Sequence, residues 1–126
     1  MSALQEFAAE TEWIARTDTV SVKVNTLAPA HGSPWHLHTV VADDVFALDE
    51  GIEVGLRGPD EIIRLVPGGH VHVVAGRVHR VVNRASIPAR YLLVQATGTY
   101  DFRVVPDQGS RGDTGQDPSA SQPRSR

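Results

Sequence analysis

The sequence predicts an all-β fold, a barrel or sandwich of antiparallel strands. About eight or nine short segments alternate apolar and polar residues, which is the pattern of strands with one buried face. Glycine, proline and aspartate separate these segments at close spacing, as expected where tight turns join neighbouring strands. A chain of 126 residues is long enough for one domain with its own core.

Residues 1–18 are predicted to be an N-terminal arm, for which two conformations stay open. Its apolar residues fit one face of a short helix, and residues 11–14 fit an edge strand equally well. Phe7, Trp13 and Ile14 are candidates to cover a sheet edge of a partner copy, because an uncovered edge invites pairing. We therefore expect a homodimer.

Residues 19–105 are predicted to form the barrel. It begins with a strand over residues 20–25, where valines alternate with polar side chains. The other segments with a strand pattern are residues 34–38, 44–48, 52–57, 61–65, 71–74, 78–83, 91–97 and 100–105. Tight turns are indicated at residues 49–51, 58–60 and 67–69.

Residues 106–126 are predicted to be a disordered tail, because a single alanine is their only apolar residue. The tail contains Arg111-Gly112-Asp113, which matches an integrin-type adhesion motif. So short a motif occurs frequently by chance in a low-complexity segment, and we assign it no function.

Composition excludes several classes of protein and of site. A net charge of -3, with scattered arginines, argues against nucleic-acid binding. No apolar run approaches the roughly 20 residues that span a bilayer, and the N-terminus lacks the pattern of a signal peptide. We therefore expect a cytoplasmic protein without a membrane partner. Since there is no cysteine, a bound metal would need histidine or carboxylate ligands.

The candidate site is organised around two histidines in one predicted strand. His36 and His38 lie two residues apart and share one face of that strand, where neighbouring imidazoles suit a metal ion. Asp44 is the expected carboxylate ligand, with Asp43 ranked second, because Asp44 shares a face with the apolar residues that follow it. His79, at the start of a later strand, is the expected third histidine.

Other residues are assigned to the pocket or to the surface. His70 and His72 alternate with two valines and are expected on the surface. Asn83 is expected to have a structural hydrogen-bonding role. The expected core or pocket-wall residues are Trp35, Phe46, Leu48, Val81 and Val94. The residues expected in solvent are His31, Arg57, Arg64 and Arg80.

At these positions the sequence resembles the cupin family, whose first motif reads G-x5-H-x-H-x3-4-E-x6-G. His36 and His38 match its paired histidines, and Gly51 matches its closing glycine. Counting back six residues from Gly51 places Asp44 at the glutamate position. The acid is thus one methylene shorter than usual and lies one residue further from His38. The opening glycine is displaced, because Gly32 is too close to His36.

The second cupin motif, G-x5-P-x-G-x2-H-x3-N, follows in order. Gly68, Gly76, His79 and Asn83 match it at the right spacing, whereas Val74 replaces its proline. The resemblance covers about residues 20–105 and implies a small single-domain cupin, a jelly-roll β-barrel with His36, His38, His79 and Asp44 around one divalent transition metal.

The resemblance implies an enzyme that acts on a small oxygen-containing metabolite. Iron, manganese, nickel and zinc all suit the ligand set, which leaves coordination positions open for catalysis. The reaction would use Lewis-acid chemistry on a carbonyl, hydroxyl or carboxylate group, or O2 chemistry, so oxygenase, isomerase, lyase and cyclase activities stay open. The alternative is a cupin without catalytic activity that binds a small ligand, with or without metal.

Overall fold

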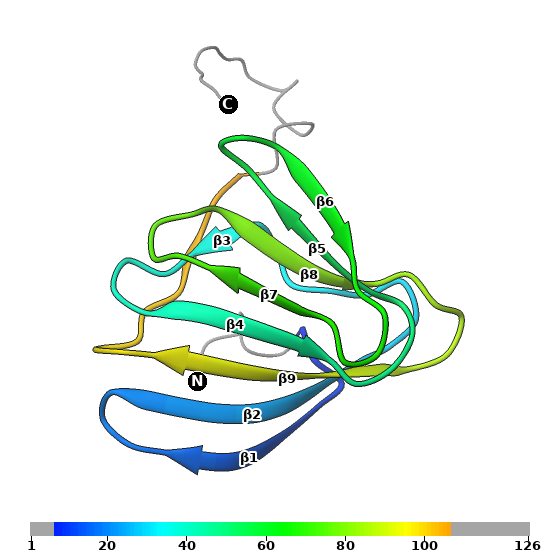
Figure 1. Ribbon diagram of the computed structural model, residues 1–126, viewed down its shortest axis with the longest axis horizontal. Coiled ribbons are helices and arrows are strands. Elements are labelled where there is room, and N and C mark those ends of the chain that lie inside the picture. The colour runs from blue at the N-terminus through cyan, green and yellow to red at the C-terminus, as the bar shows by residue number, and fades with distance from the viewer. Residues whose placement is uncertain (1–6, 107–126) are drawn as a thin grey trace.

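Two antiparallel five-stranded sheets form the barrel. A computed structural model describes residues 7–106 of the chain. The strands are β1 (Glu10–Arg16), β2 (Val20–Leu27), β3 (His36–Leu37), β4 (Ala42–Ala47), β5 (Ile52–Leu56), β6 (Glu61–Arg64), β7 (His70–Val73), β8 (His79–Asn83), β9 (Ala89–Ala96) and β10 (Arg103–Val104). In Figure 1, β1, β2, β9, β4 and β7 lie in the lower part of the view, and β3, β8, β5 and β6 lie above them. The described residues contain no helix, so the predicted all-β class is confirmed.

The strand order interleaves distant parts of the sequence. One sheet has the order β1-β2-β9-β4-β7 and the other has the order β10-β3-β8-β5-β6. Successive strands therefore cross repeatedly from one layer to the other, which is the connectivity of a double-stranded β-helix. This arrangement brings β3 beside β8 in one sheet, opposite β4 in the other, and thereby assembles the candidate site.

Side-chain alternation places an apolar core between the two sheets. In β4, Asp43, Val45 and Ala47 are buried, whereas the residues between them lie on the outer face. The core cluster draws on both sheets, which bury their apolar side chains against each other. Its fully buried members include Leu27, Val45, Val54, Val73 and Tyr91.

The N-terminal arm contains a strand, so the edge-strand alternative holds for residues 10–16. Strand β1 pairs antiparallel with β2 at the edge of its sheet, with a bulge between Trp13 and Ala15. Every residue of β1 is exposed, while Phe7, just before it, packs against the core. The predicted tail lies outside the described residues, except for Pro106.

Asn83 and Gly51 close one end of the barrel. The Asn83 amide donates to the carbonyls of Leu27 and Ile87 at 3.1 and 2.8 Å, and its oxygen accepts from the backbone N–H of Ala85. Gly51 has a φ of +105°, and a Cβ there would lie 2.6 Å from Asn83 Oδ1. Asn83 is thus structural, as expected, and a side chain at residue 51 would disturb it.

Candidate metal centre

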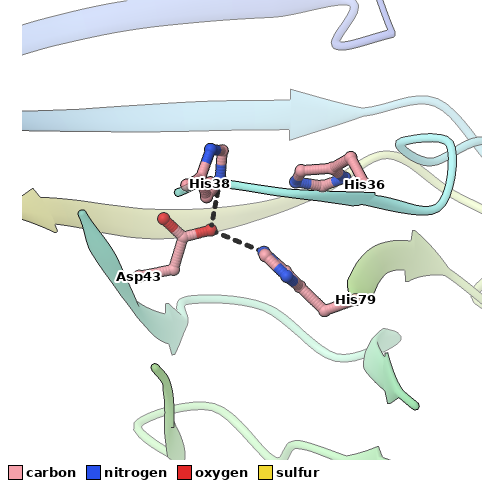
Figure 2. A group of neighbouring side chains, drawn as sticks. All are labelled: His36, His38, Asp43 and His79. Atoms are coloured by element: carbon pink, nitrogen blue, oxygen red, sulfur yellow. Dashed lines mark hydrogen bonds and ion pairs between the residues drawn. The ribbon is translucent and has the colours of Figure 1, made fainter. Parts of the chain in front are cut away.

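Four buried side chains converge at the other end of the barrel interior. His36, His38 and His79 come from β3, the residue after it and β8, and Asp43 comes from β4 of the facing sheet. One potential ligand atom from each residue lies within 4.8 Å of all the others, a separation that could accommodate a metal ion (Figure 2). Residues 36 and 79 face each other directly across the β3–β8 pairing, which explains why they meet.

Backbone carbonyls orient all three imidazoles in the same way. A carbonyl oxygen can only accept, so each Nδ1 facing one carries a proton and leaves Nε2 as the potential ligand atom. The three bonds run from Nδ1 of His36 to Pro34 O (2.8 Å), of His38 to Asp101 O (2.6 Å) and of His79 to Arg77 O (2.8 Å). Such contacts fix the tautomer and ring orientation that metal-binding histidines need.

Asp43 connects two of the histidines to the facing sheet. Its Oδ2 lies 3.1 Å from His38 Nε2 and 2.8 Å from His79 Nε2, as the dashed lines in Figure 2 show. Its Oδ1 accepts a hydrogen bond of 2.9 Å from Nε2 of Gln95, on the neighbouring strand β9. Gln95 Oε1 in turn accepts from Ser21 Oγ at 3.4 Å. Both carboxylate oxygens are therefore held in place.

Burial and mutual charge set the protonation states of the cluster. Burial, with His79 nearby, lowers the pKa of His36 to about 3, so this imidazole is neutral. Burial opposes the charge of His38, but the hydrogen bond and the charge of Asp43 outweigh it and raise the pKa of His38. Burial likewise opposes the charge of Asp43, yet bonds from His38 and His79 hold the pKa of its carboxyl far below the usual range.

Asp44 lies on the opposite face of β4, so the structure replaces the predicted Asp44 with Asp43 in the cluster. Strand alternation turns Asp44 outward, where its Oδ1 is 2.7 Å from both His70 Nε2 and His72 Nδ1. A count forward from His38 would have found Asp43, since four residues separate the two, as the first cupin motif permits. The count back from Gly51 selected the wrong neighbour.

Most of the predicted pocket residues also lie outside the cavity. Phe46 lies outside and stacks on the ring of His70 at 4.3 Å, and Leu48 is exposed. Val94 pairs with the outward Asp44 in the sheet and does not line the cavity. Trp35 lies under the guanidinium groups of Arg57 and Arg80, which are therefore not simply solvated. Val81 is buried and lines the cavity as predicted.

A cavity of about 380 Å³ opens from the cluster. The segment after β9 covers one side of it: Phe102 stacks on His36 at 4.3 Å, and the ring of Tyr100 lies 5.4 Å from that of His38. Asp101 anchors this segment by accepting bonds from the N–H and hydroxyl of Thr39, both at 2.7 Å. Sequence patterns did not predict these lining residues, because they lie in an irregular segment.

Comparison with known proteins identifies the fold. No family model matches the chain, and no curated protein matches it. Peruvianin-I, a cysteine peptidase from Thevetia peruviana latex, matches with a TM-score of 0.66 at 16% identity, over 76% of this chain and 66% of that one. A cupin-superfamily sugar phosphate isomerase from Silicibacter pomeroyi matches with a TM-score of 0.54 at 25% identity, over 62% and 50%.

Oxalate oxidase in complex with the substrate analogue glycolate matches with a TM-score of 0.66 at 15% identity, over 76% of this chain and 54% of that one. Further matches include proteins described as a cupin and as a double-stranded β-helix protein. The chain therefore has the fold of the cupin superfamily. It spans only about half the length of the oxalate oxidase and of the isomerase. Because the neighbours differ in activity, the fold alone does not give the function.

No helix among residues 7–106 is long and apolar enough to cross a membrane.

Proposed function

We propose that this protein is a metal-dependent enzyme that acts on a small metabolite through a carbonyl, hydroxyl or carboxylate oxygen. One observation carries the proposal: three histidines, each anchored through Nδ1 to a backbone carbonyl, present Nε2 to a common point beside the Asp43 carboxylate. A buried core has no other evident use for such a set, since burying ionisable groups costs free energy unless they are paired.

The donor set fits a divalent transition metal. Three imidazole nitrogens and one carboxylate oxygen suit iron, manganese, nickel or zinc and leave room for a further ligand. His36, His38, His79 and Asp43 would hold the ion, which would supply Lewis-acid polarisation of the substrate oxygen. Gln95 would keep Asp43 oriented through its bond to Oδ1.

The cavity provides the remaining requirements of an active site. Phe102 and Tyr100 shield the cluster on one side and limit the access of water, which strengthens the electrostatic interactions inside. Burial, together with the charges of Asp43 and Asp101, raises the pKa of Tyr100 to about 12. Its hydroxyl therefore keeps its proton at neutral pH and can donate a hydrogen bond to a bound oxygen.

Elemental analysis of untagged protein, before and after chelation, tests the proposal. We expect about one equivalent of a transition metal in the wild type and almost none in His79→Ala. His72→Ala, on the outer face, is the matched control and should keep the metal. Circular dichroism should show that both variants remain folded.

The metal that is found selects the activity assays. Iron leads to O2 consumption assays, and zinc, nickel or manganese leads to isomerase and lyase substrates. If the protein contains no metal and takes up none on reconstitution, the proposal is wrong. Metal with ligand binding but no turnover would instead indicate a cupin that only binds its ligand.

A further inference from the structure

Lys23 is the only lysine in the chain, and it lines the cavity that contains the metal-site residues. It lies in the middle of β2, opposite Leu93 of β9 and Trp13 of β1. Directly paired residues of antiparallel strands point to the same side of a sheet. Since Leu93 is buried on the inner face and lines the same cavity, the Lys23 side chain also extends inward.

The ammonium group of Lys23 lies near two aromatic rings, and no anion among residues 7–106 forms an ion pair with it. Its Nζ lies 4.8 Å from the ring centroid of Trp13 and 5.7 Å from that of Tyr100. Within residues 7–106, no carboxylate or hydrogen-bond acceptor lies in contact with it. Cation–π contacts compensate only part of the hydration that a half-buried ammonium loses. A cation in this position is therefore suited to an anionic partner from outside the chain.

The other charges around the cavity strengthen this argument. Burial lowers the pKa of Lys23, nearby Asp43 opposes that effect, and Arg16 adds to it. A divalent ion bound by neutral imidazoles and the single carboxylate of Asp43 keeps one positive charge, so Asp43 no longer balances Lys23. The guanidinium group of Arg16 is a second cation of the cavity lining and lies 3.6 Å from the ring centroid of Trp13. The two carboxylates of the lining are those of Asp43 and Asp18.

We propose that the cavity selects a small carboxylate whose anionic group binds Lys23 while a second oxygen function reaches the histidine cluster. Trp13, Tyr100 and Phe102 would enclose the apolar body of this ligand. A carboxylate fits better than a phosphate, because a dianionic phosphate is usually bound by several donors and the Arg16 guanidinium is stacked on Trp13. The role of the cluster in this inference rests on the proposed function, whereas the role of Lys23 does not.

Calorimetric titration of metal-reconstituted full-length protein tests the inference. The probes are 4-hydroxybenzoate, 4-hydroxyphenylacetate and 3-(4-hydroxyphenyl)propionate, each compared with its neutral amide, and phenyl phosphate. We expect at least one carboxylate to bind at least tenfold more tightly than its amide. Lys23→Met should remove that preference, whereas Lys23→Arg should keep most of it. Arg64→Met, at an exposed position of β6, is the charge-matched control and should change neither Kd.

Three results would overturn the inference: no carboxylate binds, Lys23→Met keeps the preference for the carboxylate, or phenyl phosphate binds more tightly than every carboxylate. A second readout uses the single lysine. After reductive methylation with 13C-formaldehyde, the dimethyl-lysine NMR signal should shift with a carboxylate and stay unchanged with its amide. If the protein takes up no metal, the proposed function fails, yet the same titrations on metal-free protein still decide the role of Lys23.

Discussion

The chain contains the pattern His-x-His twice, once inside the barrel and once outside. His36 and His38 are 4% and 2% exposed, whereas the side chains of His70 and His72 are 41% and 52% exposed. Each pair contacts an aspartate of β4: His38 of the inner pair contacts Asp43, and both histidines of the outer pair contact Asp44. Two neighbouring residues of one strand thus create two sites of similar composition on opposite faces of one sheet.

The two sites differ in how their rings are held. The inner rings are anchored through Nδ1 to backbone carbonyls, and a third histidine, His79, joins them from β8. The outer rings both turn toward a single oxygen, Asp44 Oδ1, and water can compete for that contact. The comparison shows that burial, fixed tautomers and a third ligand distinguish a candidate metal centre from a surface ion pair.

Replacing each of the two aspartates in turn with alanine should give the largest difference between the two sites, and that difference is in metal affinity. Asp43→Ala removes the only carboxylate of the inner cluster, so we expect metal affinity to fall about 100-fold or more. Asp44→Ala removes only the outer contact and should leave metal affinity unchanged. Competition with a chromophoric chelator measures both constants. Equal losses in the two variants would show that the outer pair also binds the metal.

Substitutions at the same two positions should also differ in how much they destabilise the metal-free protein. Asp43→Asn leaves two buried histidines without their anion, which we expect to cost on the order of 3 kcal/mol of unfolding free energy. Asp44→Asn breaks a partly exposed pair and should cost less than about 1 kcal/mol. Urea unfolding at pH 6, followed by tryptophan fluorescence, measures both. A cost below about 1 kcal/mol for Asp43→Asn would mean that the inner pair contributes little without metal.

The anchoring of His38 can be weakened without touching a ligand. Asp101→Ala removes both bonds to Thr39 and should release the segment whose carbonyl orients His38. We expect metal affinity to fall about tenfold, as is typical when a supporting hydrogen bond of a metal ligand is lost. Arg103→Ala, which removes only the exposed contact between Arg103 and Asp101, is the control. An unchanged affinity in Asp101→Ala would show that the segment does not orient the ring.

The sequence predicted the strands after residue 18 and three of the four cluster residues, because alternation and motif spacing are both local properties; β1 was one of two alternatives for the N-terminal arm. It did not predict which β4 aspartate turns inward, since apolar residues lie on both faces of that strand. Phe46 and Leu48 are larger than Val45 and Ala47, yet the smaller pair fills the core. When both faces of a strand carry apolar residues, the facing sheet decides which face turns inward, and no pattern within the strand contains that information.

The pH dependence of the stability of the metal-free protein should be the smallest of these effects. The pKa of His38 is raised above its ordinary value of 6.5, so its protonated form stabilises the folded state at low pH. That contribution is complete below pH 6.5 and is lost as the pH rises through the raised pKa. The metal-loaded protein should show the opposite trend, since protons compete with metal for the same nitrogens. Melting temperatures between pH 6 and pH 9 measure both trends. His36, whose pKa is lowered to about 3, adds a slope of opposite sign near pH 6.5, so the His38 contribution is the difference between the wild type and His38→Asn. His72→Ala should reproduce the wild-type slopes, and equal slopes in the wild type and His38→Asn would contradict the role assigned to the His38–Asp43 pair.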